Sequence, residues 1–248
     1  MEIIGHRGAS HTAPENTLAS VKRAWQLGAD AVEVDVHLTA DQRVVVIHDS
    51  NTKRTTGVDL AVRETASDKL RELDAGSHKG SEFAGEKIPF LEEVIETVPP
   101  ARRLFVEVKC SDDILPILND IIAGSGKRTQ IVIISFSLDT VSRAKTLMPD
   151  IEVCWLKGGK QDADTGQWLP YGTDIIETAR EHGLDGLDLH SGGITRSLAH
   201  AVKEAGLKLY AWTVNDPAEA ARLDALGVDG LTTDRPGWMQ ETLSARSQ

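Results

Sequence analysis

Short runs rich in Val and Ile alternate along most of the chain with longer stretches of amphipathic, helix-like periodicity. The short runs predict strands at residues 2–5, 31–37, 44–48, 104–110, 131–136, 152–156, 186–190, 208–214 and 230–233. The longer stretches predict helices at residues 15–27, 91–98, 113–123, 137–147, 174–181, 194–205 and 217–226. Strands that alternate with helices in this way are typical of a parallel sheet with helices packed outside it.

A repeated joint between helix and strand supports this interpretation. In residues 27–35, 182–190 and 226–234, a helix ends at a glycine, a short turn carries an Asp, and a strand follows. Glycine suits the position after a helix because the backbone there adopts positive φ. Eight such units would close a barrel, but nine strands are predicted. We therefore expect residues 44–48, which follow a polar turn too short for a helix, to form a hairpin return.

Residues 50–88 depart from the alternating pattern. The stretch is polar, and its glycines are Gly57, Gly76, Gly80 and Gly85. Because it is too long for a plain loop in a compact domain, we interpret it as an insertion. The prediction is one barrel domain over residues 1–248, with the insertion inside it.

Composition and charge reduce the number of functional classes that fit the sequence. The 248 residues carry a formal charge of −11, with 40% hydrophobic residues. An acidic chain does not fit a general nucleic-acid binder, which needs a basic surface. The sequence has neither a signal-peptide pattern at its start nor a membrane-length apolar run, so we expect a cytoplasmic protein without membrane insertion. Cys110 and Cys154 lie in apolar stretches and are interpreted as buried hydrophobic residues.

Acidic side chains occur where a parallel barrel carries its active site, at the carboxyl ends of strands. Glu33 and Asp35 are two residues apart and share one face of their strand, as Glu107 and Lys109 do on theirs. The three inward carboxylates carry three negative charges, one more than the two positive charges of Arg7 and Lys109. Buried charges must be paired or bound to metal, so a divalent cation resolves the excess. All-oxygen ligation favours Mg²⁺ or Ca²⁺.

Two histidines, His6 at the end of the first predicted strand and His48 at the end of the third, are candidates for proton transfer near neutral pH. Other polar residues receive structural interpretations. Asp188 and His190 are assigned structural or outer roles, and Asp234 is predicted to cap the last helix. Residues 14–17 are interpreted as a helix start, with a secondary role for Asn16 near a phosphate.

An ordered set of motifs resembles the glycerophosphodiester phosphodiesterase family of the cytoplasmic bacterial type. The motifs are His-Arg-Gly at 6–8, Pro-Glu-Asn-Thr at 14–17, Glu-Val-Asp-Val at 33–36, Val-Val-Ile-His-Asp at 45–49, Glu-Val-Lys at 107–109, Ala-Trp-Thr-Val-Asn at 211–215 and Asp-Gly-Leu-Thr-Thr-Asp-Arg-Pro at 229–236. They follow one another from residue 5 to about 238, nearly the whole chain. One departure is Asp41-Gln42, where the family often has Asp-Gly.

The resemblance implies a distorted TIM (β/α)8 barrel with an insertion after the third strand. It also implies metal-dependent hydrolysis of glycerophosphodiesters to sn-glycerol 3-phosphate and an alcohol. By position it implies metal ligands Glu33, Asp35 and Glu107. The implied acid–base pair is His6 and His48, the phosphate contacts are Arg7 and Lys109, and the apolar walls for glycerol are Phe136 and Trp212.

Several alternatives stay open at this point. A lysophospholipase D or another phosphodiesterase of the superfamily would need an apolar groove for an acyl chain. A catalytically silent phosphate-binding barrel would not need the two histidines with all three carboxylates. The expected partner is a small-molecule diester, and neither nucleic acid nor a membrane is expected. The sequence leaves open the head group, the metal, any homo-oligomer, and which histidine is the acid.

Overall fold

A computed structural model describes residues 1–246, and within them eight parallel strands close into a barrel. The strands are β1 (Glu2–His6), β2 (Ala31–Leu38), β4 (Arg103–Val108), β5 (Ile131–Ser135), β6 (Glu152–Lys157), β9 (Gly186–His190), β10 (Lys208–Trp212) and β11 (Gly230–Thr233). They are hydrogen-bonded in the order β1-β11-β10-β9-β6-β5-β4-β2, and β2 pairs back with β1. The predicted TIM barrel is confirmed.

The hairpin return is also confirmed. Strand β3 (Val44–Val46) runs antiparallel to β2, with Val36 opposite Val46. It is shorter than the predicted run, because Ile47 and His48 leave the ladder and lead toward the barrel mouth.

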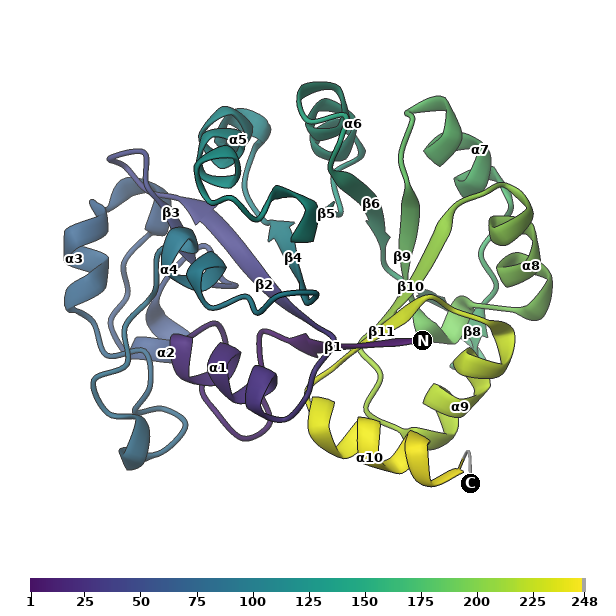
Figure 1. Cartoon of the computed structure of the whole chain (residues 1–248), viewed down its shortest axis with the longest axis horizontal. Helices are drawn as coiled ribbons and strands as arrows, with labels where there is room; N and C mark the ends of the chain where they lie inside the picture. The colour runs from purple at the N-terminus through teal and green to yellow at the C-terminus, as the bar shows by residue number, and fades with distance from the viewer. Residues whose placement is uncertain (247–248) are drawn as a thin grey trace.

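Helices surround the barrel (Figure 1). They are α1 (Leu18–Gln26), α4 (Leu91–Glu96), α5 (Leu115–Gly124), α6 (Leu138–Leu147), α7 (Asp174–Glu181), α8 (Arg196–Glu204), α9 (Pro217–Leu226) and α10 (Pro236–Arg246). Short 3₁₀ turns occur at η3 (Asp112–Ile114), η4 (Arg128–Gln130) and η5 (Ser191–Gly193). The glycines predicted to end three helices, Gly28, Gly183 and Gly227, have φ of 84°, 66° and 73°. That left-handed conformation is the reason for glycine at these joints.

The first helix begins later than predicted. Thr17 is its N-cap, and its side chain accepts a hydrogen bond from the amide of Ser20 at 3.3 Å. Asn16 precedes it with a left-handed φ of 57°, which stops the helix from extending backward. The prediction of a helix from residue 15 was therefore wrong, and Glu15 lies before the first turn of the helix.

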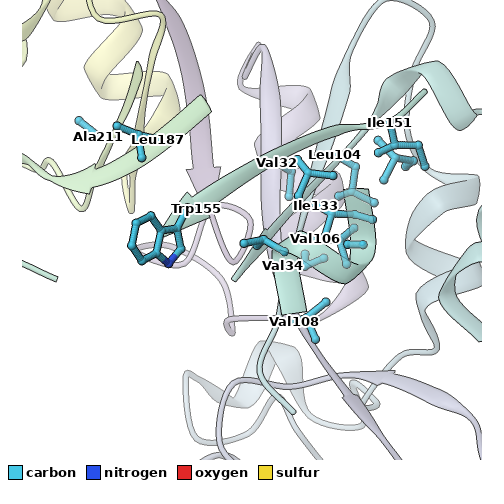
Figure 2. Close-up of a cluster of buried hydrophobic side chains, with 14 of the residues drawn as sticks. Val32, Val34, Leu104, Val106, Val108, Ile133, Ile151, Trp155, Leu187 and Ala211 are labelled. Atoms are coloured by element: carbon cyan, nitrogen blue, oxygen red, sulfur yellow. The ribbon is translucent and has the colours of Figure 1, made fainter. Parts of the chain in front are cut away.

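Two separate apolar clusters follow from the alternation of side chains along the strands. Outward residues such as Val32, Val34 and Val106 pack between the sheet and the helices (Figure 2). A smaller cluster lies inside the barrel. It includes Phe105 of β4 and Tyr210 of β10, whose rings meet edge to face with their centroids 5.1 Å apart, although the two strands are not adjacent. Since successive side chains face opposite ways, the residues between the outward valines point inward, toward the barrel axis.

Residues 50–88 form four short helical segments: α2 (Lys53–Thr56), η1 (Val62–Glu64), α3 (Ser67–Glu72) and η2 (Ser81–Phe83). In Figure 1, α3 lies at the left edge of the molecule, and α2 lies further in, next to α1 in this view. The stretch shares a small core with the residues around β3: Val45, Ile47, Val62, Leu70, Ala75 and Ile88. This core fixes its position against the barrel mouth.

A second excursion, after β6, was not predicted. Residues 157–173 contain a two-stranded hairpin, β7 (Lys160–Gln161) and β8 (Trp168–Leu169). Strands of two residues are too short to leave a periodic pattern. Trp168 stacks on His190, with ring centroids 3.9 Å apart. No helix within residues 1–246 has the length and apolar character needed to span a bilayer.

Candidate active site

A cavity of about 170 Å³ opens at the carboxyl ends of the barrel strands. Its lining consists of His6, Arg7, Glu33, His48, Glu107, Lys109, Ile134, Phe136, Leu156, Trp212, Thr213 and Thr232. The structure thus brings together the predicted site residues from six strands and the segments that follow them. Asp35, at 1% exposure, lies behind the lining and contacts two of its cations.

The three carboxylates form one cluster. Each of Glu33, Asp35 and Glu107 offers an oxygen, and these oxygens lie within 4.8 Å of one another. Burial, and then the charge of Asp35, raise the pKa of Glu107 to about 7. Burial, together with the charges of Asp35 and Glu107, raises the pKa of Glu33 well above its usual range. Without a cation, burial and mutual repulsion therefore favour protonation within this cluster.

The donor set fits a hard divalent cation. Oε2 of Glu33 accepts a hydrogen bond from the amide of Arg7 at 2.9 Å. Oε1 of the same side chain is buried and has no hydrogen-bond partner in the part of the chain that the structure describes. A buried oxygen without a partner is costly, and a cation would satisfy it. Oxygen-only ligands suit Mg²⁺ or Ca²⁺.

Two cations lie beside the carboxylates. Nε of Arg7 is 3.3 Å from Oδ2 of Asp35. Nζ of Lys109 donates to Oε1 of Glu107 at 2.8 Å and lies 3.6 Å from Oδ1 of Asp35. With all groups ionised, these five side chains sum to −1, and one divalent cation would change the sum to +1.

His48 has a defined tautomer because of its neighbours. Its Nε2 lies 3.2 Å from Nζ of Lys109, and its Nδ1 lies 2.7 Å from Oδ1 of Asp49. A lysine ammonium can only donate, so Nε2 is the acceptor and Nδ1 carries the proton that Asp49 accepts. The lone pair of His48 Nε2 therefore points toward the ammonium of Lys109, and both residues line the cavity.

His6 is held by a carboxylate that the sequence did not identify as its partner. Its Nδ1 lies 2.7 Å from Oδ1 of Asp234. Burial alone would raise the pKa of Asp234, but the hydrogen bond and charge of His6 outweigh burial and bring the pKa to about 2. The prediction that Asp234 caps the last helix was wrong. Helix α10 begins at Pro236, so Arg235 is the residue before it.

Arg54 connects the insertion to both sides of the site. From α2, its guanidinium donates to Asp49 at 2.7 Å and to both carboxylate oxygens of Glu15 at 2.7 and 2.8 Å. Glu15 in turn accepts a hydrogen bond from Arg7 at 2.7 Å. The bonds form a chain from His48 through Asp49, Arg54 and Glu15 to Arg7. No local motif signals it, because its members lie in separate segments.

Asn16 has a different contact from the one expected. It is 4% exposed, and its Nδ2 donates to Oδ2 of Asp35 at 2.7 Å. Its Oδ1 accepts from the amide of Asp35 at 3.2 Å. Asn16 therefore orients a carboxylate of the cluster, and its left-handed backbone is the strained conformation that brings the amide there.

Aromatic rings form the outer wall of the cavity. Phe136 and Trp212 meet edge to face at 5.5 Å, and the indole of Trp212 donates to the main-chain oxygen of Asp188 at 3.2 Å. Asp188 itself is 1% exposed, and burial raises its pKa well above the usual range. Lys157 turns toward the ring of Trp155, 4.2 Å away, and does not line the cavity.

Known proteins resemble this chain over nearly its full length. A sequence model of the glycerophosphoryl diester phosphodiesterase family matches residues 6–238. A glycerophosphodiester phosphodiesterase of Caldanaerobacter subterraneus is 33% identical over 94% of both chains. An Oleispira antarctica phosphodiesterase, solved with its product sn-glycerol-3-phosphate, superposes with a TM-score of 0.89 at 30% identity, covering 98% of this chain and 97% of its own. A Thermotoga maritima glycerophosphodiester phosphodiesterase superposes with a TM-score of 0.77 at 25% identity, and the match covers 100% of this chain and 98% of that one.

Proposed function

Because the chain belongs to the glycerophosphoryl diester phosphodiesterase family, we propose that it hydrolyses glycerophosphodiesters to sn-glycerol 3-phosphate and an alcohol, using one divalent cation and two histidines. One observation carries the proposal. A single cavity is surrounded by three buried carboxylates, two cationic side chains and two histidines. Each histidine is hydrogen-bonded to an aspartate of its own. The product bound to the Oleispira antarctica phosphodiesterase gives further support.

Glu33, Asp35 and Glu107 would hold the cation, Mg²⁺ or Ca²⁺. When bound, it supplies a Lewis acid for a phosphoryl oxygen. The site then carries about one net positive charge, which complements the single negative charge of a phosphodiester. Arg7 and Lys109 are placed to stabilise charge on the non-bridging oxygens.

The hydrogen bonds of the two histidines support an assignment of the proton transfers. His48 presents an unprotonated Nε2, so it acts as the base that takes a proton from the attacking hydroxyl. His6 uses Nδ1 to bond Asp234, and Nε2 remains for the cavity that His6 lines. His6 therefore acts as the acid that protonates the leaving alkoxide.

The attacking oxygen in this proposal is the 2-hydroxyl of the substrate glycerol. A tethered and well-oriented nucleophile has an effective concentration on the order of 10⁵ M or more. Its attack gives a cyclic 1,2-phosphate, which water opens with the histidine roles reversed. Ser135 does not compete, because it is 2% exposed and its hydroxyl donates to the main-chain oxygen of Val108 at 2.8 Å.

The test is an assay with glycerophosphocholine and glycerophosphoethanolamine, coupled to glycerol-3-phosphate dehydrogenase. We expect release of sn-glycerol 3-phosphate with Mg²⁺ or Ca²⁺ and its loss in chelator. His6→Ala and His48→Ala should each reduce kcat/KM by roughly 10²-fold or more. No product from any glycerophosphodiester would indicate a silent phosphate-binding barrel. Full activity in excess chelator would exclude the role of the three carboxylates.

A further inference from the structure

We propose that a second cavity, beside the first, holds the leaving alcohol and selects hydroxyl-rich alcohols. This inference rests on the proposed function, since it concerns the other half of the same substrate. The second cavity has a volume of about 350 Å³. Ser10, His11, Glu15, Lys79 and Asp234 line it, and His6 and Arg7 form the wall that it shares with the first cavity.

The two cavities differ in chemical character. Beyond the shared wall, the first cavity has the charged side chains of the site on one side and apolar side chains, including Phe136, Leu156 and Trp212, on the other. In the second cavity, every lining residue carries a polar or charged side chain, including Lys79 from residues 50–88. A phosphate at Arg7 would therefore lie between a cavity with an apolar wall and a cavity with none. The two ends of a glycerophosphodiester therefore meet different environments.

The chemistry of the displacement fixes which end goes where. In phosphoryl transfer, the attacking and leaving oxygens lie roughly in line on opposite sides of phosphorus. His48 lines the first cavity and does not line the second, whereas His6 lines both. With glycerol on the His48 side, the leaving oxygen lies on the far side, next to His6.

The step balances with these residues alone. The glycerol 2-oxygen forms a bond to phosphorus, and its proton passes to Nε2 of His48. The bond from phosphorus to the head-group oxygen breaks, and that oxygen takes a proton from His6. The neutral alcohol then leaves through the second cavity, which is open to solvent at His11 and Lys79.

The groups still available in the second cavity favour hydroxyls. The carboxylate of Glu15 is occupied by Arg7 and Arg54. The ammonium of Lys79 donates to the main-chain oxygen of Ser10 at 2.6 Å and has further protons to donate. The exposed imidazole of His11 adds a donor and an acceptor. The carboxylate of Asp234 is also occupied, since its oxygens bond His6, Ser10 and Asn215. Among the described lining residues no aromatic cage and no uncommitted carboxylate is therefore available for a quaternary ammonium, so a polyol is the better fit.

The experiment compares head groups on one glycerol phosphate. Glycerophosphoglycerol and glycerophosphoinositol should exceed glycerophosphocholine in kcat/KM by about threefold to tenfold for each hydrogen bond gained. Lys79→Met should remove much of that advantage. Lys87→Met is the matched control, because Lys87 lies in the same segment, bonds a main-chain oxygen at 3.0 Å and is outside the cavity.

A second variant tests the location by blocking it. His11→Trp adds bulk at an exposed position, and we expect KM for the inositol diester to rise about tenfold or more. Inhibition by sn-glycerol 3-phosphate, which lacks the alcohol, should keep its KI, and thermal unfolding should show that the variant is folded. A parallel rise of KI and KM, or a wild-type preference for the choline diester, would overturn the proposal. If wild type cleaves no glycerophosphodiester, the proposed function fails instead.

Discussion

The affinity of the carboxylate cluster for its cation should depend steeply on pH. The pKa of Glu107 is raised from 4.5 to about 7, first by burial and then by the charge of Asp35. Below that pH the cation-free protein holds a proton on the cluster, and the cation must displace it. Each displaced proton makes the affinity rise about tenfold per pH unit. Between pH 5 and 7 we therefore expect Glu107 alone to give a gain of about 50-fold for Mg²⁺ or Ca²⁺. The raised pKa of Glu33 makes the rise steeper.

The same shift has a consequence for stability, and its sign is defined. A carboxyl whose pKa is higher in the folded than in the unfolded protein favours folding at low pH. That advantage is lost as the pH rises from 4.5 through about 7. The loss from Glu107 is about 3 kcal/mol, since one pKa unit corresponds to roughly 1.4 kcal/mol. For a chain of this size it lowers the Tm by roughly 6–12 °C.

The assay is calorimetric titration of the cation at pH 5, 6, 7 and 8, together with thermal unfolding in chelator and in saturating cation. The cation should raise the Tm more at pH 8 than at pH 5. Glu107→Gln should flatten the pH dependence and weaken binding, whereas Glu96→Gln, on the exposed side of α4, should change neither. Equal affinity at pH 5 and pH 7 would show that the cluster is already fully ionised, and the reasoning would be wrong.

Three further predictions address the partners of the catalytic side chains and the nucleophile. Asp234→Asn removes the charge 2.7 Å from Nδ1 of His6, so kcat should fall by about 10–10²-fold while KM changes little; an unchanged kcat would limit Asp234 to a structural role. Arg54→Met should lower kcat several-fold, whereas Lys53→Met on the same helix, which pairs with exposed Asp59, should not; equal effects would refute a link through Arg54. A substrate with hydrogen in place of the 2-hydroxyl should bind and inhibit without turnover, and its hydrolysis at the parent rate would identify water as the nucleophile.

The barrel and most of the candidate site were predictable because short-range sequence patterns determine both. Alternation with period 2 placed Glu33 and Asp35 on one face, and it placed the intervening Val34 on the other. The barrel then brings the ends of its parallel strands together, whatever their separation in sequence. Residues Trp168 and Leu169 formed a strand too short to leave such a pattern. The loop helices of residues 50–88 were equally hidden within a polar stretch.

The interactions that the sequence did not predict join residues without a common period. Asp234 bonds His6 across 228 positions, and Arg54 bonds Glu15 across 39. Asp234 already had a local explanation as a helix cap, and Glu15 had one as part of a helix start. Nothing in the sequence therefore required a long-range partner for either residue. Only the closure of the barrel, which pairs β1 with β11, brings Asp234 beside the histidine at the end of β1.

The two histidines show why such contacts decide mechanism. In the sequence each ends a short predicted strand, and nothing distinguishes the acid from the base. In the structure each is bonded through Nδ1 to an aspartate, at the same distance of 2.7 Å. The difference lies at the other nitrogen. The Nε2 of His48 accepts a hydrogen bond from the ammonium of Lys109, whereas His6 lies in the wall that the two cavities share. In the proposed mechanism, this difference in environment makes His48 the proton acceptor and His6 the proton donor.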